Sequence, residues 1–241
     1  MFTYTKTRMK RFLLFLAALL FFVSLTKAQQ FRVGLLAGGN ISDVDGFNSY
    51  GHNTFRKAGF TFGGLVSTHI SAKTIIEMEI AYSQLGSSNP PDSTNNNNYY
   101  TLRLNYINVD IAIRHHVLIN FSKKPNSNFS IECGASLGYM YRDYYTAQSI
   151  ILTPYIDLST TTIAAFAGFS YNFSPDVCLD LRYYNSILSD FPNTPSNSQF
   201  LYYGSFNRGH NLNFQITFKV TFGSDSPAIV AAEGSAPPSI N

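Results

Sequence analysis

The chain has 241 residues, of which 13% are charged and 15% aromatic, and a formal net charge of +3. Five of its 17 basic residues but none of its 14 acidic residues lie in the first 28 positions, so the remainder carries 12 − 14 = −2 charges. A net charge of −2 argues against a nucleic-acid-binding protein, which would carry a cluster of basic residues on one face. The length suits one all-β domain.

The N-terminal segment has the pattern of an export signal. Four basic residues within the first 11 positions precede an apolar run of 14 residues, Phe12 to Leu25, and small residues follow up to Ala28. A membrane anchor is the weaker interpretation, because a spanning helix needs roughly 20 apolar residues. We expect residues 1–28 to be a signal peptide that is cleaved before Gln29.

Eight stretches with alternating apolar and polar residues follow the signal, as expected for strands with one apolar and one polar face. In chain order they are 31–41, 56–69, 74–85, 100–120, 129–144, 160–173, 177–185 and 212–222. The connections between them alternate between long and short, and the first is long. After the signal no apolar run approaches the length of a spanning helix. A membrane protein with this sequence would therefore have to span with strands.

The last stretch shows the alternation most clearly. Its apolar residues, which we expect to face lipid, are Leu212, Phe214, Ile216, Phe218, Val220 and Phe222. We interpret this stretch as the closing strand of an all-β fold, an eight-stranded antiparallel up-and-down transmembrane β-barrel formed by residues 29–222. A soluble barrel with an apolar interior is the alternative. The polar set favours the membrane barrel, because the interior of a small barrel is filled by side chains.

The polar faces of the strands carry five acids and five bases. These residues are Arg32, Glu77, Glu79, Asp110, Arg114, Glu132, Arg142, Asp180, Arg182 and Lys219. Buried charges persist only when they are paired and hydrogen-bonded. We therefore predict a closed salt-bridge network that plugs the lumen. A charged pathway through a narrow porin-like channel is the alternative.

No catalytic, cofactor or metal site is predicted, and we do not expect an enzyme. His115 and His116 are adjacent, so they point to opposite faces of a strand and cannot share one metal ion. A lipid hydrolase in the barrel wall would need a His, a Ser and an acid together on the lipid-facing surface. The pattern places no such trio there. Cys133 and Cys178 fall on opposite sides of the wall, which argues against a disulfide.

The loop lengths predict an orientation in a bacterial outer membrane. Such barrels have long loops outside and short turns in the periplasm, so a chain that starts and ends on the short-turn side has both termini in the periplasm. Residues 223–241 are rich in Gly, Ser, Ala and Pro and predict a disordered periplasmic tail. Besides the lipid bilayer, the expected partners are outer-membrane or periplasmic proteins that bind the loops or this tail.

Several motifs resemble a known family when they are taken in order. They are Val33 to Asn40 (VGLLAGGN), Glu79 to Gly86 (EIAYSQLG), Tyr106 to Val109 (YINV) and the glycines 134 and 138 after Glu132. Residues 31–222 thus resemble the outer-membrane β-barrel family common in Bacteroidetes, which includes PorT-like proteins, and they are similar to OmpA- and OmpX-like eight-stranded barrels. The resemblance implies an outer-membrane location, no catalytic residues and, for PorT-like members, a role in type IX secretion. We expect a structural or interaction role, with an accessory role in secretion as the alternative.

Overall fold

The structure is a computed structural model that describes residues 31–45, 55–91, 99–119, 126–151, 158–188 and 209–223, together with the single residues 93, 97 and 153. The predicted signal peptide and the predicted tail beyond residue 223 lie outside the described residues. No helix among the described residues is long and apolar enough to cross a membrane.

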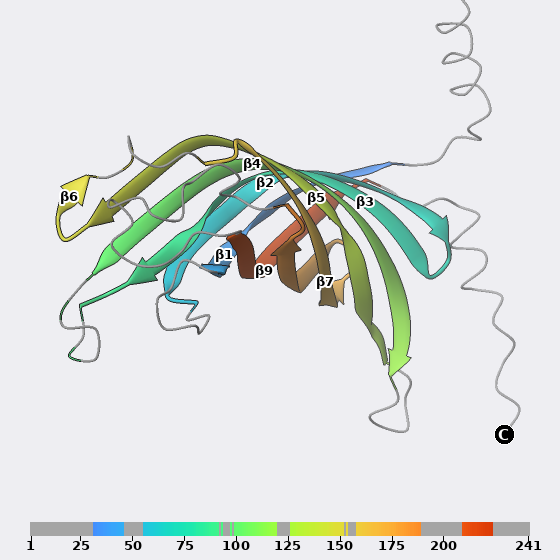
Figure 1. Ribbon diagram of the computed structural model, residues 1–241. Coiled ribbons are helices and arrows are strands. Elements are labelled where there is room, and N and C mark those ends of the chain that lie inside the picture. The colour runs from blue at the N-terminus through green and yellow to red at the C-terminus, as the bar shows by residue number, and fades with distance from the viewer. Residues whose placement is uncertain are drawn as a thin grey trace, which may run out of the picture. The chain divides into compact units, whose positions relative to one another are not determined.

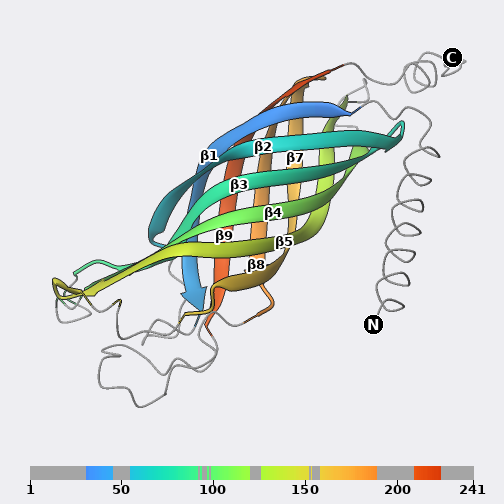
Figure 2. The ribbon, with the colours of Figure 1, turned by 90° about the horizontal axis from the view of Figure 1, so that it is seen from above.

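The described strands close into a ring of eight with one short addition (Figures 1 and 2). They are β1 (Arg32–Asp45), β2 (Lys57–Ser71), β3 (Thr74–Asn89), β4 (Tyr100–Ile119), β5 (Asn126–Ala147), the two-residue β6 (Ile150–Ile151), β7 (Thr161–Ser174), β8 (Val177–Ser186) and β9 (His210–Phe222). Each ring strand pairs antiparallel with its neighbours, β1 pairs with β9, and β6 adds to the end of β5. The predicted eight-stranded antiparallel barrel is therefore confirmed.

The wall has an apolar outer face and a polar inner face. Large apolar side chains such as Phe169, Ile80 and Leu35 are more than half exposed, whereas Arg182 and Lys219 are fully buried. A soluble barrel would carry its charges outside and its apolar residues inside. This distribution matches the apolar band and polar interior of a transmembrane barrel.

At the long-loop end, β1, β3 and β5 continue three or four residues further than the alternation predicts. β3 runs to Asn89 rather than Leu85, and its added residues pair with the first residues of β4. Gly86 allows β3 to continue its pairing with β4. Its φ of 134° is one that residues with a side chain rarely adopt, and an added Cβ would lie only 2.0 Å from the Leu102 carbonyl oxygen. In Figure 1 the sheet of β3, β4 and β5 extends toward β6.

One residue of the closing strand departs from the prediction. Leu212 is only 6% exposed, whereas the apolar residues of the same face from Phe214 to Phe222 are exposed or partly exposed. The residue lies at the long-loop end of β9, where the Phe55 ring packs against the Phe214 ring with centroids 5.1 Å apart. Leu212 is therefore buried within the protein and, contrary to the prediction, does not face lipid.

A charge placed on the outer face tests the lipid-facing assignment. Phe218 lies mid-strand and is 47% exposed, and we expect Phe218→Arg to cost about 2–4 kcal/mol of unfolding free energy if it lies at the membrane midplane. The matched change at the strand end, Phe222→Arg, should cost about 0–1 kcal/mol because it lies near the interface. Urea titrations of barrels folded in lipid vesicles measure both values. Equal costs at the two positions would contradict the placement of β9 in the membrane.

Candidate functional site: a charged cluster inside the barrel

Eight charged side chains meet inside the ring, toward the ends of the strands that the short turns connect. They are Glu77, Glu79, Asp110, Arg114, Glu132, Asp180, Arg182 and Lys219, and none is more than 4% exposed. Residues two apart on a strand point to the same side, so β3 contributes one pair and β8 another. We call these eight residues the charged cluster.

Arg182 lies at the centre of the charged cluster. Its Nε donates to Glu132 Oε1 at 2.7 Å, and its Nη2 donates to Glu79 Oε1 at 2.6 Å. The Phe166 ring lies beneath the guanidinium, with its centroid 4.7 Å from Cζ. One planar guanidinium therefore joins β8 to β3 and β5. It can do so because a guanidinium carries several N–H donors in a fixed geometry.

Tyr184 extends these contacts toward Asp110. Its hydroxyl accepts from Arg182 Nη1 at 3.2 Å and donates to Asp110 Oδ2 at 2.9 Å. Tyr184 is two residues after Arg182 and so shares its inward face. It was not singled out from the sequence, although the alternation of β8 placed it there.

Lys219 occupies the centre of a group of three carboxylates. Its Nζ lies 2.5 Å from Glu77 Oε1 and 2.6 Å from Glu79 Oε1, and it also contacts Asp180 Oδ2. Single oxygens of the three carboxylates lie within 4.8 Å of one another, a spacing that could hold a metal ion. The ammonium group takes that position. Arg114 adds a contact from its Nη2 to Asp180 at 3.0 Å.

The prediction that Arg142 points into the lumen is wrong, because a β-bulge intervenes. Asn105 of β4 pairs with Arg142, but the next residue, Tyr106, pairs with Met140, which leaves Tyr141 as an extra residue on β5. A bulge of this kind reverses which residues face which side. Met140 is buried and Arg142 is exposed.

Arg32 is buried at the short-turn end, where it pairs with Asp176 of the β7–β8 turn. Its Nη2 also donates to Thr221 Oγ1 at 2.8 Å. The charged cluster thus contains five of the predicted acids and three of the five predicted bases. If all were ionised, its net charge would be 3 − 5 = −2. The predicted balance of charges does not hold within the cluster.

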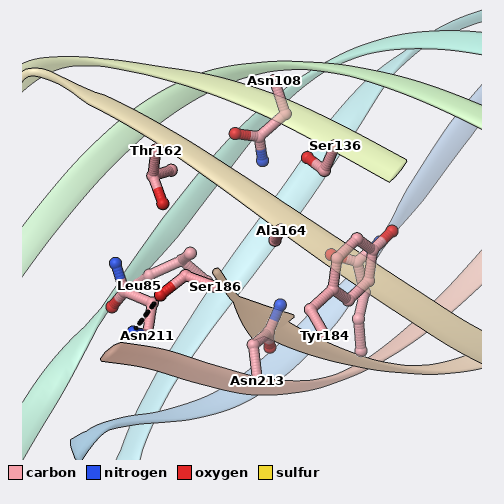
Figure 3. Close-up of a pocket in the computed structure, with 10 residues that line it drawn as sticks. Leu85, Asn108, Ser136, Thr162, Ala164, Tyr184, Ser186, Asn211 and Asn213 are labelled. Atoms are coloured by element: carbon pink, nitrogen blue, oxygen red, sulfur yellow. Dashed lines mark hydrogen bonds between the residues drawn. The ribbon is translucent and has the colours of Figure 1, made fainter. Parts of the chain in front are cut away.

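A layer of uncharged polar side chains lies next to the charged cluster, toward the long-loop end (Figure 3). It surrounds a cavity of about 20 Å³, which is room for about one water molecule. Amides and hydroxyls dominate the lining, including Asn108, Ser136, Thr162, Asn211 and Asn213.

An apolar cluster lies on the inner face of β1, β3, β4 and β5, beyond this polar layer and toward the long-loop end. Its buried members are Val44, Leu85, Tyr100, Leu102, Leu104, Tyr106, Met140, Tyr145 and Ala147. The even-numbered positions of β4 from Tyr100 to Tyr106 are all apolar or aromatic, and they continue the inward face of Asp110 and Arg114. That alternation was the signal that could have identified the apolar cluster.

The structure also brings a serine and a histidine together at the short-turn end. His116 Nδ1 lies 2.9 Å from Ser130 Oγ, which also accepts from Asn172 Nδ2 at 3.3 Å. Ser130 is 1% exposed and faces the lumen. The pair therefore does not form the lipid-facing site that a lipid hydrolase would need.

Comparisons with known proteins place this architecture in a family. A family model described as outer membrane protein beta-barrel domain matches residues 13–222. The chain belongs to this family. None of the curated proteins matches the chain. Membership makes it a protein of the bacterial outer membrane embedded in a lipid bilayer.

Several solved structures of outer-membrane barrels are similar to this chain. Neisserial surface protein A is 15% identical, with 80% of this chain and 97% of that chain covered and a TM-score of 0.43. Ail, the attachment invasion locus protein of Yersinia pestis, is 13% identical, with coverages of 80% and 99% and a TM-score of 0.42. OprG from Pseudomonas aeruginosa is 11% identical, with coverages of 82% and 98% and a TM-score of 0.37.

The excess of acids in the charged cluster predicts opposite sensitivities for its cations and its acids. We expect Arg182→Met to cost about 3–5 kcal/mol of unfolding free energy, because it leaves buried carboxylates without their cation. Asp110→Asn should cost much less, because it removes surplus negative charge and keeps an acceptor for the Tyr184 hydroxyl. Urea titrations in lipid vesicles compare the two variants. An Asp110→Asn cost equal to that of Arg182→Met would contradict the charge-excess argument.

Proposed function

We propose that the protein is a closed, non-conducting barrel with a structural or interaction role in the outer membrane. The observation that supports this role is the charged cluster, whose ion pairs join side chains of β8 and β9 to those of β3 and β5 across the lumen. An eight-stranded barrel is just wide enough for its side chains to fill it. A filled lumen removes transport as the purpose of the fold and leaves the outer surfaces for function.

The interactions of this protein are proposed to involve the long loops and the tail. The wall is surrounded by lipid, so soluble or periplasmic partners can reach the strand connections and termini. Short turns on the side of both termini favour a periplasmic location for the termini. Docking through the tail, and an accessory role in type IX secretion suggested by the PorT-like resemblance, stay predictions.

A narrow channel is the second candidate, and the polar cavity favours it. An uncharged polar layer offers hydrogen-bonding groups along which water could pass. The charged cluster opposes this function, because its ion pairs join side chains from opposite walls across the lumen. We therefore rank conduction below the closed barrel.

Conductance separates the two candidates. Purified barrel inserted in planar lipid bilayers should give no stable conductance steps, because the charged cluster closes the lumen. A larger bacterial porin inserted in the same bilayers is the positive control, and heat-modifiable electrophoretic mobility verifies that the barrel is folded. Stable single-channel steps from the folded barrel would reject the closed lumen and favour the narrow channel.

A further inference from the structure

A polar patch with two arginines lies on the outer face of the barrel, where β4 and β5 approach the long loops. Arg103 and Arg142 are both exposed. Leu102 and Leu104 on either side of Arg103 are fully buried, so Arg103 points away from the lumen. The bulge turns Arg142 to the same side. Arg142 pairs with Asn105, two residues from Arg103, which makes the two arginines diagonal neighbours on one face, about 7–8 Å apart.

The two guanidinium groups have no hydrogen-bond or ion-pair partner among the described residues. This differs from Arg114 and Arg182 of the charged cluster, each of which contacts several carboxylates. No described side chain takes up the donors of these two guanidinium groups, so they can bind a ligand outside the barrel.

The floor of the patch is built from packed aromatic rings and one fixed amide. The Tyr82 ring centroid lies 6.2 Å from that of Tyr141, 5.4 Å from that of Phe60 and 5.2 Å from that of Phe62. The Tyr82 hydroxyl donates to Asn105 Oδ1 at 2.8 Å, and Asn105 Nδ2 donates to the Arg142 carbonyl at 3.3 Å. Aromatic rings of this kind mark the boundary between the apolar core and the headgroups of a membrane.

We propose that Arg103 and Arg142 bind the phosphate of a lipid headgroup in the leaflet around the long-loop end of the barrel. A guanidinium matches phosphate with paired N–H donors. The arginines point sideways from the wall, just beyond the aromatic rings, so the group that meets them is the headgroup of a neighbouring lipid. The opposite end of the wall shows an exposed basic residue, Lys73, in the β2–β3 turn, which provides a matched control.

Lipid retention in nanodiscs tests this site. The barrel is folded in phosphatidylcholine nanodiscs that contain lipid A, either with its phosphates or after their enzymatic removal, and bound lipid A is counted by native mass spectrometry. We expect wild type and Lys73→Gln to retain phosphorylated lipid A. The double variant Arg103→Gln/Arg142→Gln should retain at least about tenfold less, as the loss of charge-assisted hydrogen bonds implies. Dephosphorylated lipid A should be retained equally weakly by all three proteins.

Two outcomes would overturn the proposal. Equal retention of phosphorylated lipid A by wild type and the double variant would show that the arginines do not bind it. Binding of inorganic phosphate or a sulfated polysaccharide to the arginines, without lipid retention, would assign the patch to a soluble anion. The proposal rests on the membrane placement of the wall but not on the closed lumen, so a conducting barrel that retains phosphorylated lipid A would reject the closed lumen alone.

Discussion

The structure depends on pairing charged groups across a narrow lumen. A strand in lipid must turn its polar residues inward, and a buried charge costs several kcal/mol unless it is paired. Arg182 meets Glu79 from a strand 103 residues earlier, and Lys219 meets Glu77 across 142 residues. Figure 2 shows β3 in one wall of the barrel and β8 and β9 in the other. The charged cluster therefore joins opposite walls that the backbone ladders connect only through their neighbours.

The side chains that close the lumen differ from those that can contact other molecules. The charged cluster crosses the lumen near the short-turn end, and the uncharged polar layer and the apolar cluster lie on the inner face beyond it. Groups available to other molecules lie on the outside. There aromatic rings pack on the outer face beside Arg103 and Arg142, whose guanidinium groups have no ion-pair partner among the described residues. This arrangement is consistent with a barrel that acts through its surfaces.

The fold could be predicted from the sequence because period-two alternation determines which side of the wall each residue faces. The same rule located all eight members of the charged cluster. It failed at Arg142, because Tyr141 adds one residue to β5 and reverses the alternation, and at Leu212, which the folded protein buries. A bulge and the burial of an outer-face residue both depend on contacts between distant parts of the chain. Alternation alone does not encode such contacts, so the excess of acids in the charged cluster was also missed.

Thiol accessibility measures the closure of the lumen most directly, because the chain carries its own reporter. Cys178 is buried inside the barrel, with its Sγ 3.5 Å from Arg114 Nη1, whereas Cys133 lies on the exposed outer face. In a Cys133→Ser variant folded in lipid vesicles, a filled lumen predicts that a water-soluble thiol reagent leaves Cys178 unmodified until urea unfolds the barrel. Rapid modification of Cys178 in the folded barrel would show an open lumen and contradict the central claim.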